Sequence, residues 1–455
     1  MMKLSESGNI RTANTWILFF IGILFTSSLV GRVSVAVPDN LDLPGAITYA
    51  LENNYSILQA KQRIREQEGL IVEIRSQALP SASIDASYIQ RDPGLIETFG
   101  GFPTNEEIWG LALNVRQALY KGGGVSAALK AQSLLEEAVL YDLKASINLA
   151  VQDVSTRFYN VLLARESIDV QEQNVELLQA QLQDATNRYE AGAVSQFEVL
   201  RAEVALANGQ PDLIRAKNGF RIAIEELRQS LGYSGGPEDV NEYPNFLGSL
   251  DYEPINISLV QALEIAKINR PELQQLELVV QAREQGIVIE RSNRLPDVDL
   301  VGSYEFNRSL ASNSFSNALN GWTIGVQSSW AIFDGKSTQG RVVQAMSQLE
   351  QARLDLGETN LDVEVEVRRA INDLQEAAEL SQASVIVIDQ AVESLRLANE
   401  LYGAGRGTQL DVRQSQVDLT QSRLNQLEAF HSYKIASAAL SKALGNAIPY
   451  AQSEE

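Results

Sequence analysis

The chain contains two copies of one sequence pattern, and this internal duplication constrains its fold more than any other feature. In the first part of each copy, equivalent residues lie 216 positions apart, as with Leu79-Pro80 and Leu295-Pro296. In the later part the separation is 213. Pairs at that separation are Trp109 and Trp322, Gly122 and Gly335, Tyr189 and Tyr402, and Gly192 and Gly405. A fixed separation that includes Pro, Trp and Gly indicates an internal repeat, so we expect both copies to fold alike.

Five segments follow from this duplication and from the N-terminus. We expect a signal peptide over 1–36, repeat 1 over 37–231, an equatorial linker over 232–256, repeat 2 over 257–444 and a C-terminal tail over 445–455. The linker is rich in Gly, Pro, Asn, Tyr and acidic residues, a composition typical of an irregular surface connection.

The N-terminus is typical of a secretory signal peptide. Basic residues precede an apolar run over 16–30, and the small residues Ser34 and Ala36 precede a cleavage site that we place after Ala36. The run is shorter than the ~20 residues of a spanning helix, although an N-terminal anchor is the alternative interpretation. We therefore expect export from the cytoplasm.

Composition excludes several classes of protein. The chain has no cysteine, which excludes a lipid-anchored form and any disulfide. Residues 1–36 carry a net charge of +2, so the formal charge of −21 becomes −23 after cleavage, which disfavours a nucleic-acid partner. Because no later stretch approaches 18 consecutive apolar residues, the mature chain could enter a membrane only with strands.

Each repeat contains two segments with the alternating pattern of a strand that is apolar on one face. We expect strands at about 81–91 and 107–119, and at about 297–307 and 321–333. Their length and aromatic residues suit transmembrane strands, and a soluble sheet packed on helices is the alternative. The residues expected to face lipid include Trp109, Leu111, Leu113, Trp322, Ile324, Val326 and Trp330.

Four strands cannot close a barrel, and an open sheet edge in lipid leaves backbone groups without hydrogen bonds. The membrane interpretation therefore requires several chains to share one barrel. Eight strands from two chains or twelve from three would both close it.

The remainder of each repeat predicts a long helical hairpin, over about 125–231 and 338–444. Between Ser126 and Ala191 there is neither Gly nor Pro, and a helix of that length would span ~100 Å. Apolar and small residues recur with heptad spacing, which predicts coiled-coil packing. Gly192 and Gly405 suit helix C-caps, and Ser195 with Glu198 and Thr408 with Asp411 predict capping boxes.

Together these motifs give the chain a resemblance to the TolC-type outer-membrane efflux proteins. The resemblance implies a mainly helical trimer with a shared 12-strand transmembrane barrel and a periplasmic α-barrel. It also implies a passive exit duct for drug efflux or type I secretion, with a periplasmic adaptor and an inner-membrane pump or ABC transporter as partners. The hairpin tips match the family's adaptor-contacting region: Tyr189, Gly192, Ser195, Gln196, Tyr402, Gly405, Thr408 and Gln409.

Members of that family close at the periplasmic end through charged and polar contacts. Here Asp389, Glu393, Arg396 and Glu400 share one helix face, and the first copy lacks the full set. We hypothesise that this charged stripe lines the periplasmic mouth, whereas a solvated outer face is the alternative interpretation.

The sequence offers little for catalysis, since it has no cysteine and its single histidine, His431, fits a packed or interfacial position. We expect neither an enzyme nor a cofactor or metal site. Two further alternatives are a periplasmic coiled-coil scaffold, which high salt would extract, and a diffusion porin, which would need more strands per chain.

Overall fold

The computed structural model describes residues 40–92, 107–233, 244–308 and 317–446. The expected signal peptide and its cleavage site lie outside these ranges. Residues 234–243 of the expected linker and 447–455 of the expected tail do so as well.

The first repeat consists of four helices and two strands with a short strand before them, and the second repeat has the same order. In repeat 1 they are β1 (Asn40–Leu41), α1 (Leu43–Asn53), α2 (Tyr55–Ser76), β2 (Ser81–Gln90), β3 (Glu107–Lys121), α3 (Gly124–Glu190) and α4 (Gln196–Leu231). After β4 (Asn245–Phe246), repeat 2 has α5 (Leu259–Asn269), α6 (Pro271–Ser292), β5 (Asp297–Asn307), β6 (Leu319–Ser329), α7 (Ser337–Gly403) and α8 (Gln409–Ala443).

The helix bounds repeat with the sequence. Helices α5 and α6 lie 216 residues after α1 and α2 at both ends, and α7 lies 213 residues after α3. The turn before each long helix also has the same backbone, because Gly123 and its equivalent Lys336 both have positive φ, +80° and +71°. The mainly helical, duplicated fold expected from the sequence is thus confirmed.

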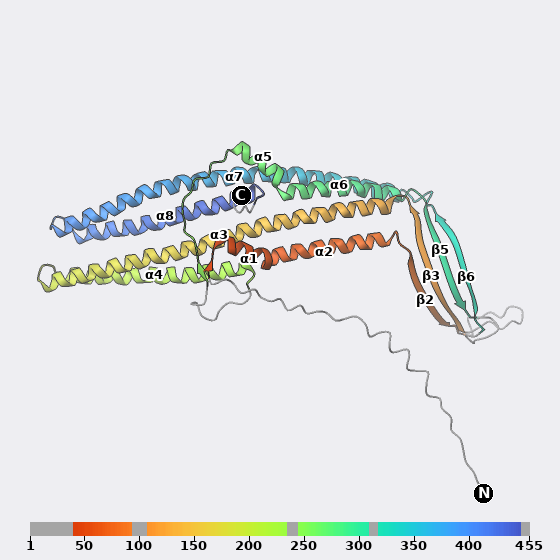
Figure 1. Cartoon of the computed structure of the whole chain (residues 1–455), viewed down its shortest axis with the longest axis horizontal. Helices are drawn as coiled ribbons and strands as arrows, with labels where there is room; N and C mark the ends of the chain where they lie inside the picture. The colour runs from red at the N-terminus through yellow and green to blue at the C-terminus, as the bar shows by residue number, and fades with distance from the viewer. Residues whose placement is uncertain (1–39, 93–106, 234–243, 309–316, 447–455) are drawn as a thin grey trace, which may run out of the picture. The chain divides into compact units, whose positions relative to one another are not determined.

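Each of the two long helices organises a hairpin, and α3 also packs along the second repeat. Helix α3 packs against α4, and α7 packs against α8, as Figure 1 shows. Helix α3 also contacts α6 and α8 of the second repeat. The order of neighbouring helices is therefore α2, α3, α6, α7 in the half nearer the strands. In the half nearer the hairpin tips it is α4, α3, α8, α7.

Small and β-branched residues at heptad spacing fill the seam between α7 and α8. Val367 and Ser381 are fully buried, and Ser381 satisfies its hydroxyl by donating to the carbonyl oxygen of Ala377 at 2.7 Å. Tyr433 of α8 joins this core, and its hydroxyl donates to the carbonyl oxygen of Glu253 at 2.7 Å. The end of the linker around Glu253 thereby packs on the second hairpin.

Strands β2, β3, β5 and β6 form one antiparallel sheet in the order β2-β3-β5-β6, and β1 pairs with β4 in a separate parallel sheet. The pairing of β3 with β5 joins the two repeats, and a bulge at Leu119 shifts its register between Ala118 and Tyr120. Strand β6 was expected over about 321–333, but it begins at Leu319 and ends at Ser329. Beyond Ser329 no described strand of this chain supplies a hydrogen-bonding partner, which explains the early end.

The backbone after α4 lies very close to the junction of α1 and α2, and the backbone after α8 lies very close to the junction of α5 and α6. A Cβ at Gly232, at the end of α4, would lie 2.3 Å from the carbonyl oxygen of Asn53, and one at Gly445 would lie 2.6 Å from that of Asn269. Both glycines have positive φ. Only glycine fits these two equivalent positions without a backbone shift.

Among the described residues, no helix combines the length and the apolar character needed to cross a membrane.

Candidate functional site: hairpin tips, charged stripe and strand sheet

The two hairpin tips have the same backbone turn. Gly192 and Gly405 adopt positive φ values of +73° and +70°, and each lies three residues after a tyrosine. The amide of Gly192 donates to the carbonyl oxygen of Tyr189, and that of Gly405 to the carbonyl oxygen of Tyr402, at 2.9 and 3.1 Å. The tips are therefore equivalent loops that close both hairpins.

Only one of the two expected capping boxes forms. Thr408 accepts from the amide of Asp411, whose carboxylate in turn accepts from the amide of Thr408 at 2.8 Å. These hydrogen bonds, first from the backbone and then from the hydroxyl of Thr408, lower the pKa of Asp411. Ser195 makes no side-chain cap hydrogen bond, so the capping box expected there was wrong.

The charged stripe lies on α7 near the second tip, and its charges interact along the helix. Arg396 contacts Glu393 at 2.6 Å and also pairs with Glu400 one turn further on. All three side chains are about half exposed. The hydrogen bond from Arg396 lowers the pKa of Glu393, so this carboxylate stays charged across the neutral range.

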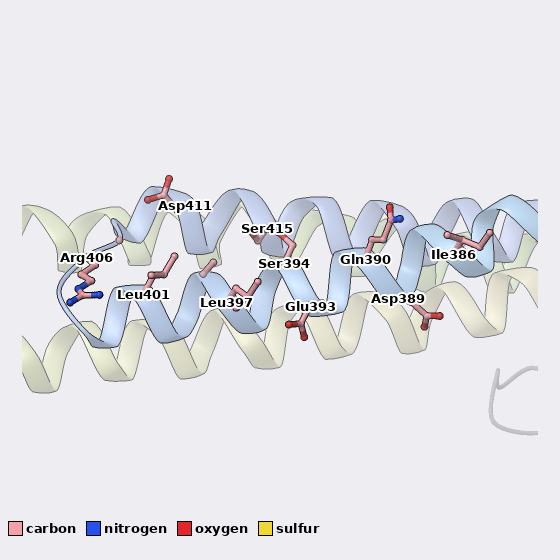
Figure 2. A pocket seen from close by; sticks show the side chains of 12 residues that line it. Ile386, Asp389, Gln390, Glu393, Ser394, Leu397, Leu401, Arg406, Asp411 and Ser415 are labelled. Carbon is pink, nitrogen blue, oxygen red and sulfur yellow. Dashed lines mark hydrogen bonds between the residues drawn. The ribbon is translucent and has the colours of Figure 1, made fainter.

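Part of the stripe lines a surface groove of about 740 Å³ between α7 and α8. Figure 2 shows Asp389 and Glu393 on α7, Arg406 in the loop and Asp411 on α8. Arg396 and Glu400 are not among the lining residues. The structure thus separates the four stripe residues into two acids at the groove and an ion pair beside it.

Sequence reasoning placed Arg406 at the second tip but not at the groove, and it missed Arg188. Arg406 contributes a cation to the groove, and Arg188 of α3 lies over the ring of Tyr402 of α7, 4.8 Å from its centroid. The second contact joins the tips of the two hairpins. Nothing in the spacing of either residue marks it, because the contact depends on how the hairpins pack.

The sheet separates apolar from polar residues by face. Successive side chains on a strand point to opposite faces, and directly paired residues share one. The pairs Tyr88 with Trp109, Leu113 with Tyr304, and Tyr304 with Trp322 therefore share a face, as do the expected lipid-facing Leu111, Ile324 and Val326. Trp330 lies beyond the end of β6, where its indole donates to the carbonyl oxygen of Arg294 at 3.0 Å.

The opposite face is polar and carries an ion cluster at the joint between the repeats. Asp299 of β5 contacts Arg116 of β3 at 2.5 Å and Lys121 at 3.2 Å, and Lys121 also reaches Asp297 at 3.4 Å. The bulge at Leu119 turns Lys121 onto this face. Because both edge strands, β2 and β6, are exposed on both faces, the sheet is not covered in the way a soluble core requires.

His431 occupies an interface, as its sequence position suggested. Its Nε2 lies 2.7 Å from Oδ1 of Asn160, so the imidazole links α8 to α3, and burial lowers its pKa. In the described ranges, no three residues of the types His, Cys, Asp and Glu gather so that they could hold a metal ion.

A sheet apolar on one face, continued by two paired helices of ~100 Å, defines the subunit of an outer-membrane duct that reaches into the periplasm. The model of the outer membrane efflux protein family matches residues 46–233 and 262–446, and the chain belongs to this family. Its members are channel proteins of the outer membrane that form trimers and work with adaptors and inner-membrane pumps.

Individual relatives agree with this assignment. The chain is 23% identical over 431 residues to outer membrane protein TolC of Vibrio cholerae, covering 93% of this chain and 94% of that protein. It is 24% identical over 417 residues to the cobalt-zinc-cadmium resistance protein CzcC of Cupriavidus metallidurans, covering 89% and 90%. The solved outer membrane channel CmeC of Campylobacter jejuni has the same fold, with a TM-score of 0.75, 17% identity and coverage of 91% and 87%.

Proposed function

We propose that three copies of this chain form a passive exit duct for drug efflux or type I secretion. In this duct the four-stranded sheets share one 12-strand barrel, and the hairpin tips contact a periplasmic adaptor. The observation that carries the proposal is the continuity of each repeat from a one-face-apolar hairpin of strands into a 67-residue helix that ends at a tip. A periplasmic scaffold would have no use for the apolar face.

The charged stripe is the proposed periplasmic gate. Asp389 and Glu393 bring two carboxylates per chain to the groove, and Glu393 is held in place by Arg396. Three copies around one axis would concentrate this negative potential at the mouth and attract cations there. The ion pairs of Arg396 would limit how far the acids move apart.

Single-channel recording tests the gate. Replacing Asp389 and Glu393 together by Ala should change conductance and weaken blockade by multivalent cations roughly tenfold. The control is Glu176→Ala, because Glu176 is the exposed first-copy equivalent of Asp389. If the double variant behaves like the control, the stripe is not the gate.

Crosslinking tests adaptor contact at the tips. A photoreactive group at Ala193 or Arg406 should capture the adaptor in intact cells, whereas the same group at Gly219, in the middle of α4, should not. Equal capture at all three positions would remove the tips as the docking region.

A further inference from the structure

We propose that Arg201 of α4 and Arg413 of α8 form a binding site for one small anion, such as chloride, which links the two helical hairpins near their tips. The site lies outside the charged stripe and does not depend on the proposed gate. It assigns a ligand to a cavity between the two repeats.

The cavity lies where the two returning helices begin. Both arginines stand within the first two turns of their helices. The cavity has a volume of about 10 Å³, which is room for about one water-sized group. A chloride ion is only slightly larger, whereas a polyatomic anion is too large. The lining residues are Gln181 of α3, Arg201, Ala202 and Ala205 of α4, and Gln409 and Arg413 of α8.

The two guanidinium groups bring more positive charge to this cavity than the residues around it neutralise. In the described part of the chain, the exposed side chain of Arg413 has neither an ion-pair nor a hydrogen-bond partner. Arg201 approaches Glu198 at 3.8 Å, beyond hydrogen-bond distance, and Glu198 does not line the cavity. By contrast, Arg188 in the same hairpin contacts Asp184 at 2.8 Å. Two like charges that face one cavity repel each other, and an anion between them attracts both.

Amide groups complete the set of donors. The side chain of Gln181 borders the cavity from α3, and that of Gln409 borders it from α8. The Oε1 of Gln409 is buried and has no hydrogen-bond partner among the described residues. A half-turn of this amide places its N–H group at the same position, where an anion would accept from it. Guanidinium and amide N–H groups therefore surround the proposed ion.

The duplication shows that helix packing does not require these two arginines. The equivalent of Arg201 in the second copy is Gln414, and Arg413 stands at the position of Leu200 in the first copy. The same positions of the repeat thus also accept a neutral amide and an apolar side chain. The paired cations belong only to the groove between α4 and α8, and ligand binding accounts for them.

The anion would stabilise the contact between the hairpins, because its two arginines belong to different repeats. Without it, like charges face each other across the seam. The first turns of α4 and α8 should then open more readily, and this local opening is measurable.

Hydrogen exchange of the detergent-solubilised protein tests the site. At constant ionic strength, chloride in place of gluconate, which is too large for the cavity, should slow exchange of the first amides of α4 and α8. The expected effect is about threefold when chloride is at roughly twice its dissociation constant. It should disappear in Arg201→Gln with Arg413→Leu, which carries the residue types of the equivalent positions. Arg423→Gln is the control and should keep the effect, because Arg423 of α8 donates to Gln173 outside the cavity.

Crystals of the wild-type chain grown in bromide give a second test that needs no variant. Anomalous scattering should place a bromide ion between Arg201 and Arg413. Bromide density without a chloride effect on exchange would indicate an adventitious ion only and would overturn the proposal. A chloride effect that persists in the double variant, or a cavity without bromide, would overturn it as well. If the double variant does not fold, the two wild-type measurements decide.

Discussion

At the scale of single residues, a partly buried ion cluster lies where α5, α6, α7 and α8 meet. Arg270, between α5 and α6, is 5% exposed and contacts Glu366 of α7 at 2.8 Å. Lys442 of α8 contacts the same carboxylate at 2.5 Å, and Glu272 contacts Arg270 at 3.0 Å. At the equivalent junction of the first copy an uncharged hydrogen bond takes this place: Asn54, the equivalent of Arg270, donates to the carbonyl oxygen of Ser230 at 2.7 Å.

Glu366→Gln should destabilise the fold at neutral pH. A fully buried ion pair that loses one partner typically costs about 3–5 kcal/mol, and we expect at most the lower end because the side chain of Glu366 is 34% exposed and Glu272 still pairs with Arg270. Urea unfolding of the detergent-solubilised protein measures the loss. The control is Asp153→Asn, the first-copy equivalent, whose partly exposed pair with Arg157 should contribute less than about 1 kcal/mol. Equal losses would show that burial of the cluster does not matter.

The same carboxylate predicts a pH dependence. Burial acts to raise the pKa of Glu366, but Lys442 and Arg270 outweigh it, and the pKa lies below the ordinary 4.5. A group with a lowered pKa stabilises the folded state above its ordinary pKa and loses that contribution as the pH falls through the folded value. The difference in unfolding free energy between the wild type and Glu366→Gln should therefore shrink below pH 4.5. A constant difference down to pH 3 would contradict this assignment.

At the scale of the helix, the two tips differ in their caps. Thr408→Ala removes a capping box and should cost about 1 kcal/mol of local stability, whereas Ser195→Ala should cost almost nothing. Hydrogen exchange of the first amides of α8 and α4 measures both. Faster exchange should appear only in α8, and similar changes in both helices would show that the caps do not decide tip stability.

Sequence could predict the existence of these helices but not every cap. The heptad and the absence of Gly and Pro predict α3 and α7, and the alternation predicts the strands. The cap at Ser195 does not form, although Glu198 stands at the third helical position as a capping box requires. Glu198 lies 3.8 Å from Arg201 instead, and the equivalent of Arg201 in the second copy is the neutral Gln414. The end of β6 was also beyond prediction, because it depends on which strand lies beside it.

At the scale of the whole molecule, the pattern predicts each repeat but not how the repeats pack together. Helix α3 contacts α8 through a polar seam in which Asn174 accepts from Gln416 and Thr420, at 3.1 and 3.3 Å. A heptad shows that a helix has a partner face, but it does not identify the partner. The charged stripe is a comparable case. Its residue spacing predicts four charges on one helix face, but only the packing of α7 against α8 decides that Asp389 and Glu393 line the groove.

The duplication then predicts the helix joint between copies, independently of the strands. Asn174 and Thr420 correspond to Val387 and Ala207, and both of these are exposed in the single chain. If α7 packs against α4 of a second copy as α3 packs against α8, Val387→Cys with Ala207→Cys should give disulfide-linked oligomers. Asn174→Cys with Thr420→Cys should link within one chain and serves as the control. Asn174 and Thr420 are replaced by apolar residues at this joint, and the equivalent of Gln416 is the acidic Glu203. A second acid beside it should repel it, so Val387→Asp should also weaken the oligomer in detergent, whereas Asn174→Asp should leave its size unchanged. Links in the control pair without links here would mean that the repeat symmetry does not extend to the contacts between copies.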